Sequence, residues 1–459
     1  MTEAHKAQEP TFAAPPPTAA QSNPGQGDAR PSNAQIFVIV GGGLAGARAA
    51  ETLRSEGFAG RVIIVAGERA VPYLRPPLSK GYLQGQDDRD SLDVHTAPWY
   101  ATKGIEIVLG MPASALSRAH KTLTLGDGTV LHYDKLLLAT GASPRHFDEP
   151  STHLTGVHHL RGIDSATLLR VALQPGGRRI VIIGSGWIGL EVAATARGYG
   201  NTVTVIGHSA VPLGHAIGDE AGSVFADLHR DNGVELLMNT TVHGIIGGEH
   251  GVTGVRLGDD TVLAADVVVV AIGASPNVQL ARAAGLPIHR EVPHGPISGI
   301  TVDAGFCTTD VDVYAVGDVA SVFHPVLGAQ LHVEHWANAE YAGPAAARSM
   351  LGQHVSYDAI PYFYTDQFDL GMEYSGYPSL AAGATVVFRG DRAGREFVAF
   401  WLLENRVVAG MNVNVWDVNE TVQELIRSRV VVDPARLVDL TVNLEQLLTA
   451  RGAAERVTD

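Results

Sequence analysis

The chain contains a short apolar run that leads directly into a glycine-rich turn, Gln35-Ile36-Phe37-Val38-Ile39-Val40-Gly41-Gly42-Gly43-Leu44-Ala45-Gly46. The run is rich in β-branched residues, which is typical of a strand buried on both faces of a parallel sheet. Gly41, Gly43 and Gly46 have the GxGxxG spacing, and a helical pattern follows at residues 47–53. In such a turn the first glycine allows the tight bend, the second lets a pyrophosphate approach the backbone, and the third lets the helix pack on the strand. The stretch predicts a dinucleotide-binding unit.

The same order of elements recurs 143 residues later. A strand pattern at residues 179–183 precedes Gly184-Ser185-Gly186-Trp187-Ile188-Gly189, and a helical pattern at 190–197 and a strand pattern at 202–206 follow. After each unit, short alternating strands surround a Gly-Asp turn, at residues 123–133 and 254–262. One GxGxxG motif is weak, but two copies in the right context indicate two dinucleotide sites. We expect one to hold a flavin and the other an exchanging nicotinamide coenzyme.

The pattern changes from about residue 357 to a meander, with strands expected at residues 385–389, 396–403 and 406–413 and helices at 418–427 and 444–450. This arrangement predicts an α/β protein with two Rossmann-like, doubly wound, three-layer dinucleotide-binding domains and a C-terminal α+β domain. We expect an FAD-binding domain at residues 35–147 and 275–350, an NAD(P)H-binding domain at 148–274 and a C-terminal interface domain at 351–459.

The N-terminal residues 1–34 are rich in Ala, Pro, Gln and Ser, and we expect a disordered tail because they bring little apolar surface to bury. Pro15-Pro16-Pro17, Glu3 and Glu9 interrupt any signal-peptide pattern, so a cytoplasmic location is expected. No apolar run approaches the roughly 18 residues of a membrane span, which predicts no membrane partner.

Composition excludes several kinds of chemistry. The formal net charge of −15 argues against nucleic-acid binding, because phosphates require a basic surface. A single cysteine, Cys307, excludes an internal disulfide, a CxxC redox pair and a cysteine-ligated iron–sulfur cluster. His332 and His335 have helical i, i+3 spacing, but two histidines without further ligands do not predict a metal site.

The residues that follow the second strand of each unit bear on which nucleotide that unit binds. Glu68, 22 residues past Gly46, is placed to accept hydrogen bonds from the adenosine ribose of the first nucleotide. The second unit has Gly207-His208 at this position, with neither an acid for a ribose 2′-hydroxyl nor an arginine for a 2′-phosphate. The choice between NADH and NADPH therefore stays open.

Four further stretches of sequence carry a family resemblance. They are Tyr73-Leu74-Arg75-Pro76-Pro77-Leu78-Ser79-Lys80, Ala139-Thr140-Gly141-Ala142-Ser143-Pro144-Arg145, and Tyr314-Ala315-Val316-Gly317-Asp318-Val319-Ala320 with the later Val333-Glu334-His335-Trp336. Over about residues 35–430 the chain resembles the ferredoxin, rubredoxin and putidaredoxin reductase branch of the FAD-dependent pyridine nucleotide-disulphide oxidoreductase superfamily. Apoptosis-inducing factor shares this plan.

The resemblance implies roles for individual residues. Asp318 would hold the flavin ribityl chain, Arg75 and Arg145 would lie along the FAD, and Lys80 would stand near flavin N5, paired with Glu191. A fixed ammonium group there would lower the cost of the negative charge that arrives with a hydride. Trp336 would line the nicotinamide and flavin face, so the expected catalytic residues are Lys80, Glu191 and Trp336. The expected cofactor-binding residues are Gly41, Gly43, Leu44, Ala45, Gly46, Glu68, Arg75, Lys80, Ala139, Thr140, Gly141, Arg145, Gly184, Gly186, Ile188, Gly189, Glu191, Gly207, Gly273, Gly317, Asp318, Glu334, His335 and Trp336.

The resemblance implies an FAD-dependent NAD(P)H:ferredoxin reductase of the ferredoxin–NAD(+) reductase type. Hydride would pass from NAD(P)H to flavin N5, and single electrons would then pass to a small iron–sulfur ferredoxin or rubredoxin that feeds an oxygenase such as a cytochrome P450. Two alternatives stay open: direct reduction of a small molecule such as a quinone or an ascorbyl-type radical, and a redox-sensing interaction protein similar to apoptosis-inducing factor. A homodimer through the C-terminal domain is also expected. Docking an acidic ferredoxin would need a local basic patch, for which Arg69, Arg75 and Arg89 are candidates.

Overall fold

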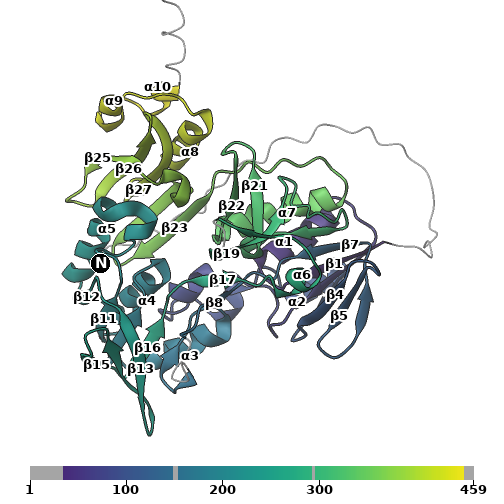
Figure 1. Cartoon of the computed structure of the whole chain (residues 1–459), viewed down its shortest axis with the longest axis horizontal. Coiled ribbons are helices and arrows are strands. Elements are labelled where there is room, and N and C mark those ends of the chain that lie inside the picture. The colour runs from purple at the N-terminus through teal and green to yellow at the C-terminus, as the bar shows by residue number, and fades with distance from the viewer. Residues whose placement is uncertain (1–34, 148–152, 292–294, 449–459) are drawn as a thin grey trace, which may run out of the picture.

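Two parallel five-stranded sheets form the frame of the molecule (Figure 1). The computed structural model describes residues 35–147, 153–291 and 295–448, so the expected disordered tail at residues 1–34 lies outside the described residues. The first sheet has the order β20-β7-β1-β2-β3, formed by β1 (Ile36–Val40), β2 (Arg61–Val65), β3 (Ile105–Val108), β7 (Lys135–Leu138) and β20 (Val313–Ala315). The second has the order β12-β11-β10-β16-β9, formed by β9 (Val157–His158), β10 (Arg179–Ile183), β11 (Thr202–Ile206), β12 (Val234–Leu237) and β16 (Val267–Val270).

The two sheets repeat one plan, as the sequence predicts. β1 lies between β2 and β7 in the same way that β10 lies between β11 and β16. The helices after the glycine turns are α1 (Leu44–Ser55) and α4 (Trp187–Gly198). Both begin three residues earlier than expected, because Gly43 and Gly186 are the N-caps and the third glycine of each motif lies inside the first helical turn.

A two-stranded antiparallel pair, β8 (Ala142–Pro144) with β17 (Ala274–Pro276), joins the two halves. β20 then returns the chain to the first sheet beside β7. Smaller sheets flank the frame: β4 (Ala113–Ser117), β5 (Thr122–Leu125) and β6 (Val130–His132); β13 (Val242–Gly248), β14 (Gly251–Leu257) and β15 (Val262–Ala264); and β18 (Ile288–Arg290), β19 (Ile297–Val302), β21 (Ala320–His324) and β22 (Ala329–His332). The remaining helices before residue 351 are α2 (Ala97–Thr102), α3 (Ile163–Leu173), α5 (Gly214–Asp231), α6 (Gln279–Ala283) and α7 (Trp336–Met350).

The C-terminal part is an antiparallel sheet of order β23-β24-β27-β26-β25 with three helices. Its strands are β23 (Tyr362–Gln367), β24 (Leu370–Gly376), β25 (Thr385–Asp391), β26 (Glu396–Leu403) and β27 (Arg406–Val413), and its helices are α8 (Asn419–Ser428), α9 (Pro434–Val438) and α10 (Glu445–Leu448).

Both faces of this C-terminal sheet are covered. Because side chains alternate along a strand, Phe397 and Trp401 of β26 pack in one core with α5, whereas Val398 and Phe400 pack in another with α8. Figure 1 shows α5, from the second Rossmann-like unit, against this sheet. The C-terminal sheet is therefore anchored on the second unit. Within the three described ranges, no helix combines the length and the apolar character needed to cross a membrane.

His229 of α5 is buried at this contact, with 0% of its surface exposed. Burial lowers the pKa of the His229 imidazole to about 4, although a hydrogen bond with Gln367 opposes this shift. An unfolded histidine titrates near 6.5, so between pH 6.5 and 4 the unfolded chain binds more protons than the folded one. Stability from this group is therefore present above pH 6.5 and is lost as the pH falls through this window.

We expect the H229Q variant to lose less stability than the parent chain on acidification. Between pH 6.5 and 5 the buried neutral histidine costs the parent about 2 kcal/mol of unfolding free energy, at 1.36 kcal/mol per pKa unit. Urea unfolding midpoints at pH 7 and pH 5 measure the difference. The exposed His120 provides the control, because H120Q should lose as much stability as the parent. Equal losses in H229Q and the parent would contradict the prediction.

Candidate functional site

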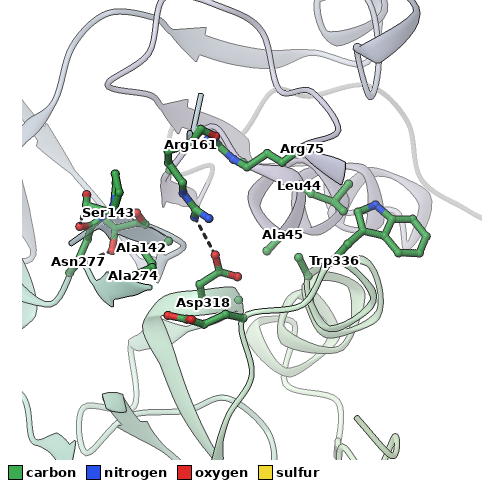
Figure 2. Close-up of a pocket in the computed structure, with 18 of the residues that line it drawn as sticks. Leu44, Ala45, Arg75, Ala142, Ser143, Arg161, Ala274, Asn277, Asp318 and Trp336 are labelled. Carbon is green, nitrogen blue, oxygen red and sulfur yellow. Dashed lines mark hydrogen bonds and ion pairs between the residues drawn. The ribbon is translucent and has the colours of Figure 1, made fainter. Parts of the chain in front are cut away.

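A cavity of about 880 Å³ lies at the carboxyl ends of strands from both sheets (Figure 2). The glycine turns after β1 and β10 both line it, as do the residues that follow β2, β7, β16 and β20. The carboxyl edge of a parallel sheet is where α/β proteins bind nucleotides. One cavity thus brings together the two turns that the sequence predicts to hold two dinucleotides.

The first and third glycines of each turn are required by the backbone. Gly41 and Gly184 have φ angles of +133° and +114°, and a Cβ on either would collide with a carbonyl oxygen, that of Ala139 or Ala271. A Cβ on the third glycine, Gly46 in the first turn, would collide with the carbonyl oxygen of Gly41, the first glycine of the same turn. These positions therefore exclude larger residues on structural grounds alone.

The second glycines, Gly43 and Gly186, have a different explanation. Their φ angles, −90° and −84°, are ordinary for any residue, and no protein atom lies within 4 Å of a Cβ built on either. Both residues line the cavity, so an added side chain would occupy space in it. This space beside a helix N-terminus, where backbone N–H groups and the helix dipole favour anions, fits the pyrophosphate of a dinucleotide.

Lys80 and Glu191 form an ion pair at the cavity wall, with Nζ 2.8 Å from Oε1. Lys80 follows the short 3₁₀ turn Pro76–Ser79, and Glu191 lies in the first turns of α4, 4% exposed. Ser79 Oγ donates to Glu191 Oε2 at 2.5 Å, and Thr365 Oγ1 of β23 donates to Oε1 at 2.6 Å. Three donors thus satisfy a carboxylate that would be costly to bury alone.

An aromatic wall continues from this ion pair. The ring of Phe363 in β23 stacks on His335 at 4.3 Å between centroids and meets Trp187 at 5.0 Å. The Lys80 ammonium lies 5.3 Å from the centre of the Tyr364 ring. Burial lowers the pKa of His335 to about 4, so its ring is neutral at pH 7. Phe363 and His335 thus present stacked, uncharged rings near the Lys80 ammonium, a surface suited to further planar rings.

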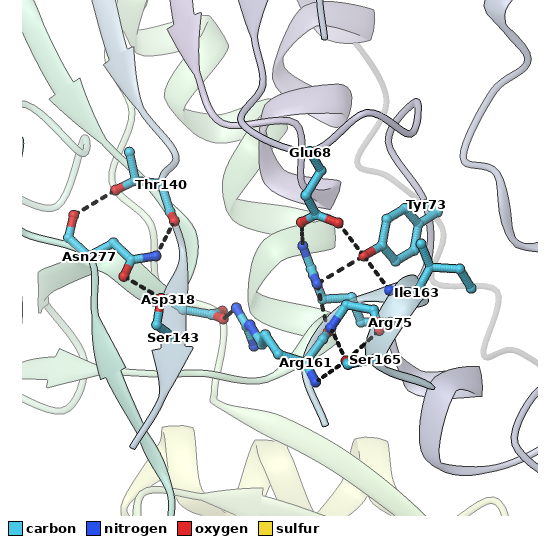
Figure 3. A network of polar contacts seen from close by, with 11 residues as sticks. Glu68, Tyr73, Arg75, Thr140, Ser143, Arg161, Ile163, Ser165, Asn277 and Asp318 are labelled. Atoms are coloured by element: carbon cyan, nitrogen blue, oxygen red, sulfur yellow. Dashed lines mark hydrogen bonds and ion pairs between the residues drawn. The ribbon is translucent and has the colours of Figure 1, made fainter. Parts of the chain in front are cut away.

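A polar network borders the cavity on the side of the first sheet (Figure 3). Glu68 accepts hydrogen bonds from Arg75 at 2.5 Å and from the Tyr73 hydroxyl at 2.6 Å. Burial acts to raise the pKa of Glu68, but the charge of Arg75 and these two hydrogen bonds together lower it. Arg161, which lines the cavity, donates to Asp318 Oδ2 at 2.7 Å. Figure 2 shows this ion pair as a dashed line. Glu68 and Asp318, the two acids expected at the ends of the flavin nucleotide, are therefore each paired with an arginine.

Arg161 is a site residue that the sequence analysis missed. It lines the cavity, whereas the expected Arg145 does not: Arg145 Nε donates to the Ala274 carbonyl oxygen at the β8–β17 pair. Arg161 follows the two-residue strand β9, which is too short to give a periodic signal. Its place just beyond a strand of the second sheet is the one signal that could have found it.

Asn277 was also missed, and it connects the two halves of the chain beside the cavity. Its side chain accepts a hydrogen bond from Ser143 Oγ at 2.8 Å and donates one to the Thr140 carbonyl oxygen at 2.8 Å. The Thr140 hydroxyl in turn donates to the Asn277 carbonyl oxygen at 2.9 Å (Figure 3). These bonds hold the crossing between the two units in one geometry.

The remaining predicted residues divide into two groups. Five do not line the cavity, namely Gly46, Arg145, Gly184, Gly189 and Gly207. Gly207 is packed under Ser185 and Met238, where a Cβ would lie 2.6 Å from the Met238 methyl carbon, so an acid does not fit there without rearrangement. The others all line it: Gly41, Gly43, Leu44, Ala45, Glu68, Arg75, Lys80, Ala139, Thr140, Gly141, Gly186, Ile188, Glu191, Gly273, Gly317, Asp318, Glu334, His335 and Trp336.

His332 and His335 do not lie on one helix, although their spacing is helical. His332 ends β22, where its Nε2 lies 2.8 Å from the Asp318 carbonyl oxygen, and His335 is the N-cap of α7. Among the described residues, no group of three or more His, Cys, Asp or Glu side chains is arranged to hold a metal ion.

Sequence comparison places the chain in a known family. Residues 36–343 match the family model described as pyridine nucleotide-disulphide oxidoreductase, and residues 362–448 match the one described as reductase C-terminal. The ferredoxin–NAD(+) reductase component of the anthranilate 1,2-dioxygenase system of Burkholderia cepacia is 38% identical over 419 residues, covering 91% of this chain and 100% of the relative. Putidaredoxin reductase of Pseudomonas putida is 33% identical over 423 residues, covering 91% and 97%.

Solved structures agree with this placement. The covalent putidaredoxin reductase–putidaredoxin complex has a TM-score of 0.84 and 33% identity, covering 92% of this chain and 100% of the reductase. The ferredoxin reductase for the CYP199A2 system of Rhodopseudomonas palustris also has a TM-score of 0.84 and 33% identity, covering 90% and 99%. The chain belongs to the pyridine nucleotide-disulphide oxidoreductase family and is an FAD-dependent NAD(P)H oxidoreductase with the Rossmann-type fold and C-terminal domain of these reductases.

Proposed function

We propose that this chain is an NAD(P)H:ferredoxin reductase that supplies electrons, through a small iron–sulfur protein, to an oxygenase such as a cytochrome P450. The observation that carries the proposal is the single cavity that both glycine turns and the Lys80–Glu191 pair line. The relatives named above support it, because they are ferredoxin and putidaredoxin reductases and the similarity extends over nearly their whole lengths.

The residues of the first turn fit FAD. The open space at Gly43, the N-terminus of α1 and the acidic Glu68 suit a pyrophosphate followed by an adenosine ribose. We infer that Asp318 holds the ribityl hydroxyls and that Arg75 and Arg161, which line the cavity, lie along the FAD. Bound there, FAD supplies the conversion of a two-electron hydride donor into a source of single electrons.

Lys80 and Glu191 hold a fixed charge at the reacting end of the cavity. The Lys80 ammonium stabilises negative charge that arrives with a hydride, and the pre-formed pair needs no reorganisation at that moment. Glu191 keeps the ammonium in place through the 2.8 Å ion pair. We infer that Trp336 and the aromatic wall orient the nicotinamide ring and exclude water from it.

We also propose a division of the chain into three functional domains. Residues 35–147 and 275–350 hold FAD, 148–274 hold NAD(P)H, and 351–459 form the interface domain, with the boundary at 148 and the last eleven residues outside the described residues. The cytoplasmic location and the homodimer stay predictions, and light scattering on the purified protein tests the dimer.

Arg75 and Arg89 do not supply the expected basic docking patch by themselves. Both guanidinium groups lie against the Tyr73 ring, at 5.0 and 5.4 Å from its centre, and each is paired with an acid, Glu68 or Asp93. The acceptor therefore meets a surface on which these two charges are already compensated.

Anaerobic cytochrome c reduction by the FAD-loaded protein tests the proposed function. With NADH or NADPH as donor, adding a [2Fe–2S] ferredoxin should increase the rate at least about tenfold, since the ferredoxin relays single electrons. The two donors are compared in the same run, which ranks the coenzymes. Saturable turnover of a quinone with no effect of ferredoxin would contradict the proposal and favour a small-molecule reductase. A flavin that stays bleached, with a change in elution volume, would instead favour a redox sensor.

A further inference from the structure

A buried line of hydrogen bonds leads from α5 to the Lys80–Glu191 pair. His229 Nε2 lies 2.9 Å from Gln367 Oε1, and Gln367 Nε2 donates to Thr365 Oγ1 at 3.1 Å. Thr365 Oγ1 donates to Glu191 Oε1, the same oxygen that accepts from Lys80. His229, Gln367 and Thr365 are 0%, 1% and 1% exposed. None of the three lines the cavity, so the line runs behind it.

The chemistry of the groups gives this line one direction. The Gln367 amide nitrogen can only donate, so the Thr365 oxygen accepts from it and the single hydroxyl proton is left to donate to Glu191. The Gln367 oxygen then faces His229, whose Nε2 must carry the proton. His229 Nδ1 is buried without a partner, and the low pKa of the ring keeps it neutral. Every donor therefore points toward Glu191.

The residues in this line of hydrogen bonds come from three parts of the chain. Glu191 and His229 come from α4 and α5 of the second unit, Thr365 and Gln367 from β23 of the C-terminal sheet, and Lys80 from the first unit. Thr365 and Gln367 are two residues apart in a strand, so both project from the same face of β23. The C-terminal sheet thus reaches the ion pair through one hydroxyl group.

Glu191 Oε1 is shared between a charged donor and a neutral one. If the Thr365 hydroxyl is lost, one lone pair of a buried carboxylate is left without its donor, which is costly and favours a change in the carboxylate's orientation. Lys80 bonds to the same oxygen and would move with it. The Lys80 charge also acts on Asp366, the next residue along β23, where it opposes the rise in pKa that burial causes.

We propose that Thr365, Gln367 and His229 are positioning residues for hydride transfer, which hold Glu191, and through it the Lys80 ammonium, in the orientation that serves the flavin. The inference rests on the proposed function, because it assigns Lys80 to the reacting end of the cavity. It gives the C-terminal sheet a part in the reductive half-reaction, in addition to any contact with the electron acceptor.

The test compares T365V, which keeps the shape of the side chain and removes the hydroxyl, with T365S, which restores it. At saturating NADH or NADPH, flavin reduction in T365V should slow about fivefold, the effect of one neutral hydrogen bond on a barrier, and T365S should return within about twofold of the parent. The flavin midpoint potential, measured by spectroelectrochemistry without nicotinamide, should become more negative in T365V and recover in T365S.

A matched control is Ser375 on the neighbouring strand β24, which is 0% exposed and donates to Asn419 Oδ1 at 2.6 Å, away from Glu191. S375A removes a buried hydroxyl from the same sheet, so it should lower the melting temperature and leave the reduction rate and the potential unchanged. If T365V behaves like S375A, with lower stability but the parent's rate and potential, the three residues are structural and the proposal is wrong.

Two further variants make every outcome informative. If T365V does not retain FAD, Q367M can be used instead, because it breaks the same line of hydrogen bonds one step further from Glu191. A parent-like rate and potential in Q367M would overturn the proposal. K80A and the parent protein together distinguish a failure of the proposed function from a failure of the positioning role. A parent protein whose flavin neither coenzyme reduces would refute the proposed function. Slow reduction in K80A with normal reduction in T365V would refute the positioning role alone.

Discussion

Replacing Lys80 by alanine is expected to slow reduction of the flavin by NADH or NADPH about tenfold or more, equivalent to at least about 1.4 kcal/mol of transition-state stabilisation. The reason is electrostatic: the Lys80 side chain is 16% exposed, its ammonium is held 2.8 Å from Glu191, and it lines the cavity beside the Tyr364 ring. In such a site a fixed charge acts with little solvent screening. Stopped-flow absorbance at saturating coenzyme measures the effect.

The control for K80A is K103A, because Lys103 is exposed beside Trp99 and does not line the cavity. E191Q should also slow reduction, since it removes the charge that keeps Lys80 in place. FAD content must be equal in all variants. If K80A with full FAD occupancy is reduced as fast as the parent, Lys80 has no part in the mechanism.

Substituting valine at the second glycine of each turn is expected to separate the two nucleotide sites. G43V should fold normally, because its φ is ordinary and no protein atom opposes a Cβ, yet FAD binding should weaken about a hundredfold or more, or by at least about 2.8 kcal/mol. G186V should retain FAD, so the protein stays yellow, but should lose the response to NAD(P)H by a similar factor. In both variants the side chain occupies the space that a pyrophosphate needs.

FAD retention after gel filtration and the coenzyme dependence of flavin bleaching measure the two effects. The control is G198V, because Gly198 ends α4 on the surface and a Cβ there also meets nothing within 4 Å. G198V should change neither binding step. The assignment of the turns would be contradicted if G43V kept its FAD and G186V lost it.

Local motifs predicted the frame of the site well. Each glycine turn, such as that at residues 41–46, lies between a strand pattern and a helical pattern within about two dozen residues. The two units could therefore be predicted from local sequence, without knowledge of any tertiary contact. The block that ends in Ser79-Lys80 and the first turns of α4 each supplied half of the ion pair. The pairing of Lys80 with Glu191 followed from the resemblance, because residues 111 positions apart share no local pattern.

Residues whose role depends on tertiary contact could not be found in this way. Arg161 follows a strand of two residues, and its partner Asp318 is 157 positions away in the sequence. Thr365 and Gln367 are ordinary strand residues until β23 packs against α4 and α5. Spacing alone also does not show that His332 and His335 lie on no common helix, since α7 begins only at Trp336.

The most direct test of the central claim is a double-mixing experiment with the FAD-loaded protein in the absence of oxygen. Mixing with NADH or NADPH should bleach the flavin absorbance, and a second mixing with oxidised [2Fe–2S] ferredoxin should restore it while two ferredoxins are reduced for each hydride, since each accepts one electron. This result would establish the path from nicotinamide through the flavin to an iron–sulfur acceptor. A flavin that bleaches, stays reduced with ferredoxin and recovers only with a quinone would contradict it.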